Sequence, residues 1–266
     1  MRDRRNTVQS AEVGGEVLKA LARLSPAATL SQIGDETGMP VAKVHRYLQA
    51  LQTSGLAEQD PLTGRYMLGP EALQIGLAAL DRLDVVAIAS QCLPALSEAI
   101  RQSCFLAVWA NRGATVVRGS AVASTITIVT RVGTVLPLLG SATGLVFAAF
   151  VDDLALDGVP DETMAATRAE ISSSGPLVAE RLARIRRHGE ATVQGLYMPG
   201  LDSIAVPVFG LGRKVVAVLT AVGPHGGFDV GATSPIRTRL VETATTVSAQ
   251  LGFQDARVPQ PKVSAT

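Results

Sequence analysis

A chain of 266 residues, of which 47% are hydrophobic, is long enough for one large or two modest domains, and we expect two. Its 24 Lys and Arg residues nearly balance 23 Asp and Glu residues, so any nucleic-acid surface must be local. With only two cysteines the chain lacks a disulfide framework, and we expect Cys92 and Cys104 to be reduced, buried thiols of a cytoplasmic protein. We expect no secretory signal, because no apolar core region follows the three arginines of residues 1–10. We expect no membrane span, because Pro and Gly interrupt the longest apolar run, residues 135–151.

The first fifty residues predict three short helices. Apolar residues recur at helical spacing over residues 11–24, which predicts the first helix. Thr29 and Gln32 have the spacing of a capping box, which predicts the start of a second helix. After a turn at Gly38, Pro40 suits the first turn of a third helix. The apolar stripe of this third helix consists of Val44, Leu48 and Leu51.

A hairpin and a fourth helix follow. Residues 56–68 form two short strand-like runs around a polar turn, which is typical of a β-hairpin. Three helices followed by a hairpin make a winged helix-turn-helix, which we place at residues 1–69. The apolar repeat of residues 70–83 predicts a linker helix, so we expect the domain boundary there.

The rest of the chain predicts an α+β domain over residues 84–253 and a disordered tail at residues 254–266. Strands joined by short turns favour an antiparallel sheet. The predicted helices cover residues 85–101, 141–150, 178–188 and 234–251, and the predicted strands cover residues 105–110, 115–119, 125–130, 203–209 and 214–223.

Three sequence blocks carry a family resemblance. They read "VHRYLQALQTSGLAEQDPLTGRYMLGP" from Val44, "RVGTVLPLLGSATG" from Arg131 and "GLYMPGLDSIAVPV" from Gly195. The chain resembles the IclR family of bacterial transcription regulators over nearly its whole length. The resemblance implies a winged helix-turn-helix joined by a linker helix to a GAF-like effector-binding domain, whose antiparallel sheet is flanked by helices. It also implies a homodimer or tetramer.

The resemblance makes the third helix the recognition helix that enters the DNA major groove. We expect Lys43 to reach bases or phosphate and Arg46 to clamp phosphate, with His45 beside them; a solvated helix face is the alternative. Val41 and Ala42 stand where the family commonly has a basic and a hydroxyl residue. This difference predicts a different operator, in which Val41 or Ala42 meets a thymine methyl group.

Further DNA contacts are expected from the wing and the second helix. Arg65 on the wing either contacts the DNA backbone or minor groove, or pairs with Asp60. Ser31 and Gln32 are candidates for phosphate contacts, although capping already explains Gln32 and Thr29.

The resemblance also implies a site for a small carboxylate effector. Gly140, Ser141 and Ala142 match the anion-binding helix start, where free N–H groups and the helix dipole favour negative charge; a plain N-cap is the alternative for Ser141. Ser203 and Thr220 are the hydroxyl residues of the facing strands.

Several positions differ from the family pattern of this site. Leu139 replaces a frequent His, Leu145 a frequent Lys, Val193 a frequent Asp, Gly195 a frequent Glu and Val222 a frequent Ser. Fewer charged walls favour an effector with one acidic end and a larger apolar or aromatic body. Trp109 either lines this site or packs in the core. Tyr197 and Met198 form either a lid over the site or a surface loop. Arg131 either binds the effector carboxylate or flanks the sheet.

An enzyme and a ligand-sensing adaptor are the alternatives to a regulator. An enzyme would need a nucleophile with a base in reach, and only His45, His188 and His225 could serve as that base. The sequence also contains no nucleophile elbow, no dinucleotide-binding loop and no metal-ligand cluster. We expect no cofactor and no metal. An adaptor that senses a ligand without binding DNA is the other alternative, because the third helix has few polar groups.

The sequence thus predicts a homo-oligomeric regulator of a catabolic operon. We expect it to bind a near-palindromic double-stranded operator, as a repressor or an activator, and to respond to a small organic acid through differential affinity for two states. The linker helix is the expected transmitter.

Overall fold

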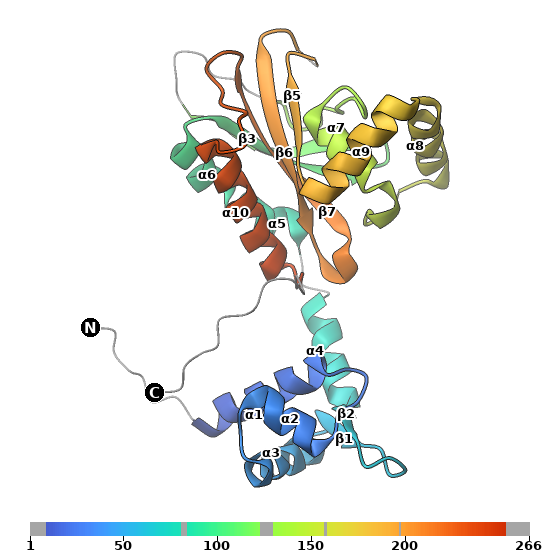
Figure 1. Cartoon of the computed structure of the whole chain (residues 1–266), viewed down its shortest axis with the longest axis vertical. Helices are drawn as coiled ribbons and strands as arrows, with labels where there is room; N and C mark the ends of the chain where they lie inside the picture. The colour runs from blue at the N-terminus through green and yellow to red at the C-terminus, as the bar shows by residue number, and fades with distance from the viewer. Residues whose placement is uncertain (1–8, 81–83, 123–129, 157–158, 197, 254–266) are drawn as a thin grey trace, which may run out of the picture. The chain divides into compact units, whose positions relative to one another are not determined.

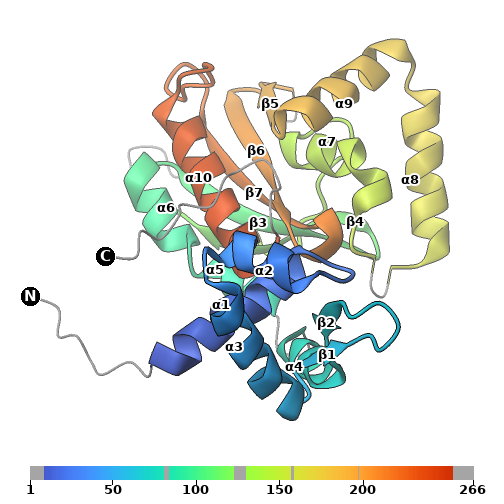
Figure 2. The same ribbon diagram turned by 60° about the horizontal axis from the view of Figure 1, so that its bottom comes forward.

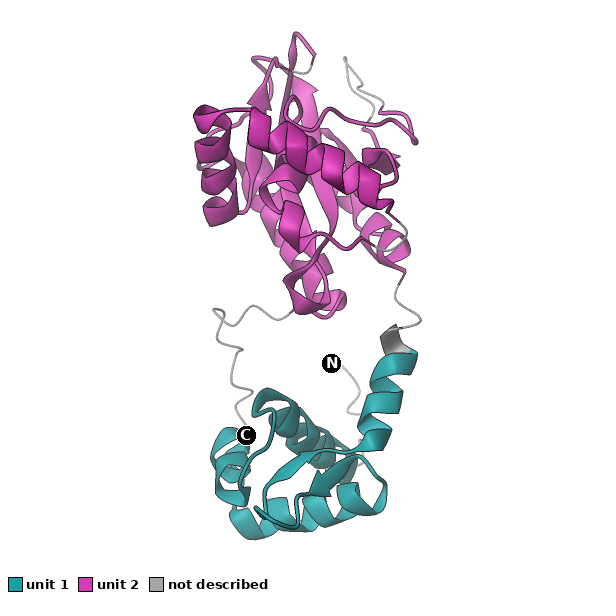
Figure 3. Ribbon diagram, turned by 90° about the vertical axis from the view of Figure 1, so that its right-hand side faces the viewer, with its two compact units in different colours: residues 1–83 teal, residues 84–266 magenta. Residues whose placement is uncertain are grey.

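The computed structural model describes residues 9–80, 84–122, 130–156, 159–196 and 198–253 (Figure 1). Most of the predicted strand 125–130, the predicted tail, Tyr197 and the last three residues of the predicted linker helix lie outside these ranges. The chain divides into two compact units, residues 1–83 and 84–266 (Figure 3). No helix in the described ranges is long and apolar enough to cross a membrane.

The first unit is a winged helix-turn-helix, as predicted. Its elements are α1 (Gln9–Arg23), α2 (Leu30–Thr37), α3 (Val41–Thr53), β1 (Ala57–Gln59), β2 (Tyr66–Leu68) and α4 (Pro70–Leu80). The first three helices cluster together while β1 and β2 form the antiparallel wing beside them (Figure 2). Apolar side chains from all three helices meet in one core around Val17, Ile33 and Leu48.

Local signals explain how the helices of the first unit begin and end. The predicted capping box is present: Gln32 N donates to Thr29 Oγ1 and Thr29 N donates to Gln32 Oε1, at 3.3 and 2.9 Å. Gly38 ends α2 with φ 67°, a left-handed conformation that glycine adopts without a steric cost. Pro40 is the N-cap of α3, one position before the predicted first turn.

The second unit is an α+β domain around a five-stranded antiparallel sheet of order β4-β3-β7-β6-β5. The strands are β3 (Ser103–Ala110), β4 (Gly113–Ser120), β5 (Ala191–Gln194), β6 (Leu201–Phe209) and β7 (Val215–Pro224). The helices are α5 (Val85–Ser90), α6 (Leu93–Ile100), α7 (Ala142–Ala149), α8 (Asp161–Ser173), α9 (Pro176–His188) and α10 (Pro235–Gln250). Helices α5, α6 and α10 cover one face of the sheet, and α7 covers the other with α9 packed against it (Figure 1).

Three predictions for this unit were wrong or incomplete. The predicted helix 85–101 is two helices, α5 and α6, because Pro94 in the first turn of α6 lacks the N–H that a continuous helix would need. Helix α8 was missed because only Met164 and Thr167 on it are buried, which leaves no apolar stripe. Strand β5 was missed because it is a four-residue edge strand.

Candidate functional site

The exposed face of α3 has a different residue set from the predicted one. Ala42, His45, Arg46 and Gln49 are exposed and lie at helical spacing opposite the buried stripe, whereas Lys43 is half-buried at the side of this face. The Arg46 guanidinium lies 5.8 Å from the centroid of the Tyr47 ring, close enough for a cation–π contact. Within the described chain, none of Lys43, His45 and Arg46 forms an ion pair.

The wing leaves Arg65 exposed. Asp60 accepts hydrogen bonds from Leu62 N at 2.9 Å and from Thr63 Oγ1 at 2.6 Å, and these bonds, the Thr63 bond first, lower the pKa of the Asp60 carboxyl. Among the described residues no ion pair joins the side chains of Asp60 and Arg65, and the two residues are linked by the backbone bond from Asp60 N to Arg65 O, at 2.9 Å.

The second helix exposes Ser31 and Gln32. The Gln32 side-chain carbonyl already accepts from Thr29 in the capping box. Its amide N–H₂ group remains available as a donor.

A cavity of about 300 Å³ opens where α7 begins against the sheet of the second unit. Its polar lining consists of Thr130, Arg131, Thr134, Ser141, Thr143, Ser203 and Thr220, and its apolar lining of Phe105, Leu136, Ala142, Val193, Met198, Leu201 and Val222. We call this the α7 cavity. Its volume lies at the small end of the range for small-molecule sites.

Hydroxyl groups at the base of the α7 cavity already form hydrogen bonds within the protein. Ser141 Oγ donates to Pro137 O at 2.8 Å and accepts from Gly144 N at 2.9 Å, so the serine is the N-cap of α7 and has no proton left for a ligand. Thr143 and Thr220 are each only 1% exposed, and their hydroxyls lie 2.8 Å apart. Because one of them must donate to the other, the pair retains a single hydroxyl proton for a ligand.

Backbone N–H groups add to this polar end. Gly144 N is occupied by the Ser141 cap, while the N–H groups of Ala142 and Thr143 have no partner in the described chain. They lie at the first turn of α7, where the helix dipole favours an anion. The α7 cavity therefore has an anion-accepting end and largely apolar walls.

The structure brings six predicted effector residues to the α7 cavity and leaves three out. The six are Ser141, Ala142, Val193, Ser203, Thr220 and Val222. Gly140 and Leu139 do not line it, and Leu139 packs instead against the hydrophobic core. Trp109 is also absent from this lining: it packs against Phe147, with 5.4 Å between ring centroids, and lines a different cavity.

The residues at this cavity that the sequence did not single out are Phe105, Thr130, Thr134, Leu136, Thr143 and Leu201. Phe105 is the cross-strand partner of Thr220, so the two-residue alternation of the strands could have placed it on the same face. Thr143 carried no signal, because its role depends on how the start of α7 meets β7.

The described residues offer no alternative catalytic or metal site. They contain no group of three or more His, Cys, Asp or Glu side chains that could hold a metal ion. His225 Nδ1 lies 3.0 Å from both carboxylate oxygens of the buried Asp202, but no nucleophile completes this pair in the interactions of the described chain.

Comparisons with known proteins match both units. A family model for the "IclR helix-turn-helix domain" matches residues 10–61, and one for the "Bacterial transcriptional regulator IclR C-terminal" matches residues 77–249. The glycerol operon regulatory protein of Streptomyces griseus is 28% identical over 247 residues, which are 92% of this chain and 97% of that protein. The DNA-binding transcriptional repressor YiaJ of Escherichia coli is 28% identical over 258 residues, 92% of this chain and 88% of that protein.

A solved structure extends these matches. The crystal structure of Pseudomonas aeruginosa HmgR is 47% identical, with a TM-score of 0.84, and the match covers 94% of this chain and 100% of that one.

Proposed function

Because the chain belongs to the IclR family of bacterial transcriptional regulators, we propose that it binds a near-palindromic operator as a homo-oligomer and responds to a small organic acid with an apolar or aromatic body. The family binds DNA through its helix-turn-helix domain and small molecules through its C-terminal domain, and it is not a family of enzymes. The match over residues 10–61 favours DNA binding over an adaptor role. The proposal also includes a cytoplasmic location and control of a catabolic operon.

DNA contact is proposed to centre on the exposed face of α3. His45 and Arg46 would meet the DNA there, Arg46 on phosphate, with Lys43 reaching phosphate from the side of the helix. Ala42 on the same face would meet a thymine methyl group, and Arg65 would contact the DNA from the wing. Ser31 and Gln32 would add phosphate contacts from α2.

The apolar surface of α4 supports association of two copies. Leu73, Ile75 and Leu77 on this helix are all exposed, and a run of large exposed apolar side chains usually marks an interface. A two-fold dimer would present two recognition helices, which explains why we propose a near-palindromic operator.

The polarity of the α7 cavity is the observation that carries the proposed ligand class. Two unpartnered N–H groups and one hydroxyl proton suit one carboxylate, and Arg131 at the same cavity adds a cation. Val193, Val222 and Phe105 line the remaining space, where a larger apolar body would be buried. A two-carbon acid would leave these walls without contacts.

The test is thermal melting of the purified protein with benzoate, phenylacetate, hexanoate, pyruvate and glyoxylate. A ligand that binds only the folded state raises its stability, by about 2.7 kcal/mol at a hundred times the dissociation constant. We expect the three larger acids to raise the melting temperature and the two small ones not to. A shift with pyruvate or glyoxylate alone would contradict the proposed ligand class.

A matched pair of variants locates the binding. The double variant Thr143→Val/Thr220→Val removes the hydroxyl proton that this pair offers to a ligand, and Thr115→Val removes a hydroxyl of β4 that does not line the α7 cavity. We expect the first variant to reduce the melting shift and the second to preserve it. Equal shifts in both variants would mean that the acids bind elsewhere.

A further inference from the structure

A second cavity, of about 320 Å³, lies in the effector unit between the β3–β4 hairpin and α8. We call it the α8 cavity. It is lined by Trp109, Asn111, Arg112, Gly113, Ala114, Leu136, Leu138, Thr163, Ala166, Thr167 and Glu170. Leu136 is the one residue that the described linings of the α7 and α8 cavities share, so its side chain forms part of the wall between them.

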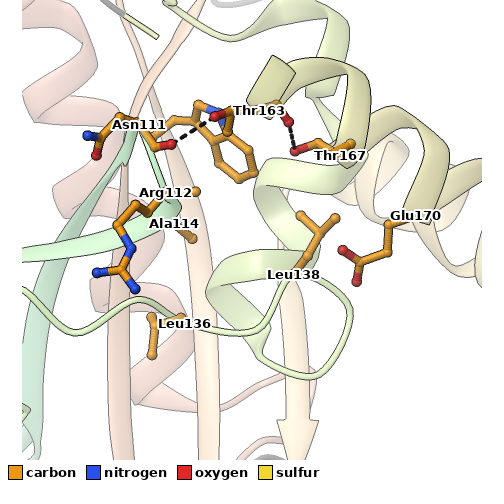
Figure 4. A pocket seen from close by; sticks show the side chains of 11 residues that line it. Asn111, Arg112, Ala114, Leu136, Leu138, Thr163, Thr167 and Glu170 are labelled. Atoms are coloured by element: carbon orange, nitrogen blue, oxygen red, sulfur yellow. Dashed lines mark hydrogen bonds between the residues drawn. The ribbon is translucent and has the colours of Figure 1, made fainter. Parts of the chain in front are cut away.

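One hydrogen bond ties the two sides of the α8 cavity together. Thr163 Oγ1 on α8 donates to Asn111 O at the end of β3, at 2.8 Å, and Thr167 Oγ1 donates to Thr163 O at 2.7 Å (Figure 4). Both hydroxyl protons are therefore used within the protein. Toward a ligand, Thr163 and Thr167 can act only as acceptors.

The two sides of the α8 cavity have opposite hydrogen-bonding character. On the hairpin side is Arg112, which has only donors. On the α8 side are the Glu170 carboxylate and the two threonine acceptors. Figure 4 shows Arg112 and Glu170 on opposite sides of the cavity, with Leu138 between them. Neither charged side chain forms an ion pair within the described chain.

Trp109 supplies an independent observation. The side chain is only 8% exposed, and its Nε1 atom is buried without a hydrogen-bond acceptor in the described protein. A buried N–H without an acceptor is rare in folded proteins because it costs free energy. Because this atom is buried, a molecule in the α8 cavity could accept from it only after a local shift of the hairpin or of α8.

We propose that the α8 cavity is a second small-molecule site, which takes an elongated zwitterion with a carboxylate at one end, an ammonium group at the other and an apolar middle. The carboxylate lies on the hairpin side, where Arg112 donates. The ammonium group lies on the α8 side, where Glu170 and the threonine oxygens accept. The apolar middle packs on Leu136 and Leu138, two buried residues that line the cavity.

The only tryptophan of the chain makes this proposal directly measurable, because Trp109 emission reports on the α8 cavity itself. The probes are ω-amino acids with four to eight carbons, titrated into the full-length protein. Fatty acids and alkylamines of the same lengths serve as controls that keep only one charged end. We expect a saturable change in emission with at least one ω-amino acid, which binds about two- to five-fold tighter than either control of its length.

Charge-removing variants assign each end of the probe. In Arg112→Gln the ω-amino acid should bind no tighter than the alkylamine, and in Glu170→Gln no tighter than the fatty acid. Glu162→Gln changes an exposed carboxylate of α8 outside the cavity lining and should leave its affinity unchanged. Thr220→Val in the α7 cavity should also leave it unchanged.

Three results would overturn the proposal: no saturable emission change at any chain length, an advantage over both controls that survives in both charge-removing variants, or a loss of affinity in Thr220→Val. None of these measurements reads operator binding, and repeating the fatty-acid titrations in Thr143→Val/Thr220→Val separates binding in the α8 cavity from acid binding in the α7 cavity. A failure of the second site and a failure of the proposed regulator function are therefore distinguishable.

Discussion

The hydroxyl pair of Thr143 and Thr220 gives a quantitative prediction about the base of the α7 cavity. Replacing either residue by valine keeps the shape of the side chain and removes one partner of the 2.8 Å hydrogen bond. Because both side chains are buried, the remaining hydroxyl loses its partner away from solvent, which costs about 1–3 kcal/mol. We therefore expect each single variant to lower the free energy of unfolding of the second unit by about that amount.

The double variant separates this cost from a general packing defect. With both hydroxyls replaced, no unpaired polar group remains. The free energy of unfolding of Thr143→Val/Thr220→Val should therefore be at least as large as that of the less stable single variant. The expected coupling energy is therefore about 1–3 kcal/mol. Urea denaturation followed by Trp109 emission measures it, because the only tryptophan lies in this unit. Single-variant losses that simply add in the double variant would refute the pairing.

The remaining predictions concern the start of α7, the capping box and the thiols. In Gly144→Ala the new Cβ would lie 2.1 Å from Pro137 O, so we expect the free energy of unfolding, measured by urea denaturation, to fall by about 3 kcal/mol. Gly15 has open space around it, so the control variant Gly15→Ala should not destabilise α1. Thr29→Ala should cost about 1 kcal/mol in thermal unfolding of the first unit, followed by circular dichroism. Burial raises the pKa of the Cys104 thiol to about 12. Alkylation of Cys104 by iodoacetamide at pH 8 should therefore be far slower in the folded protein than in the protein unfolded in urea. The thiol's contribution to stability should fall as pH rises from about 8.5 toward 12, because the unfolded state loses the thiol proton first. Rapid alkylation of the folded protein would contradict this.

The first unit was predictable because its signals are local. The Thr29–Gln32 capping box, the left-handed Gly38 and the polar turn of the wing each act within a few residues. The division of α3 into a buried and an exposed side also follows from its helical period. This period does not fix how far the flanks of the buried stripe are covered, and Lys43 is half-buried on one of them.

The second unit was harder to predict because its site depends on contacts between distant segments. The bond between Thr143 and Thr220 joins residues 77 positions apart, and no local pattern indicates it. Trp109 was open to either reading, since an aromatic side chain on a strand suits a cavity or a core, and the structure gives it a core contact and the α8 cavity. Helix α8 was missed because only two of its residues are buried, which leaves no apolar stripe in the sequence. The α8 cavity was therefore missed as well.

The most direct test of the central claim is operator affinity as a function of salt, measured with a DNA fragment from upstream of the gene for wild type, Arg46→Gln and Arg186→Gln. Arg186 is exposed on α9 in the effector unit and serves as the control. We expect Arg46→Gln to weaken binding and to reduce the slope of log affinity against log salt by about one per subunit, because one phosphate contact is lost. Arg186→Gln should match wild type. An unchanged affinity and slope in Arg46→Gln would contradict DNA recognition by the exposed face of α3.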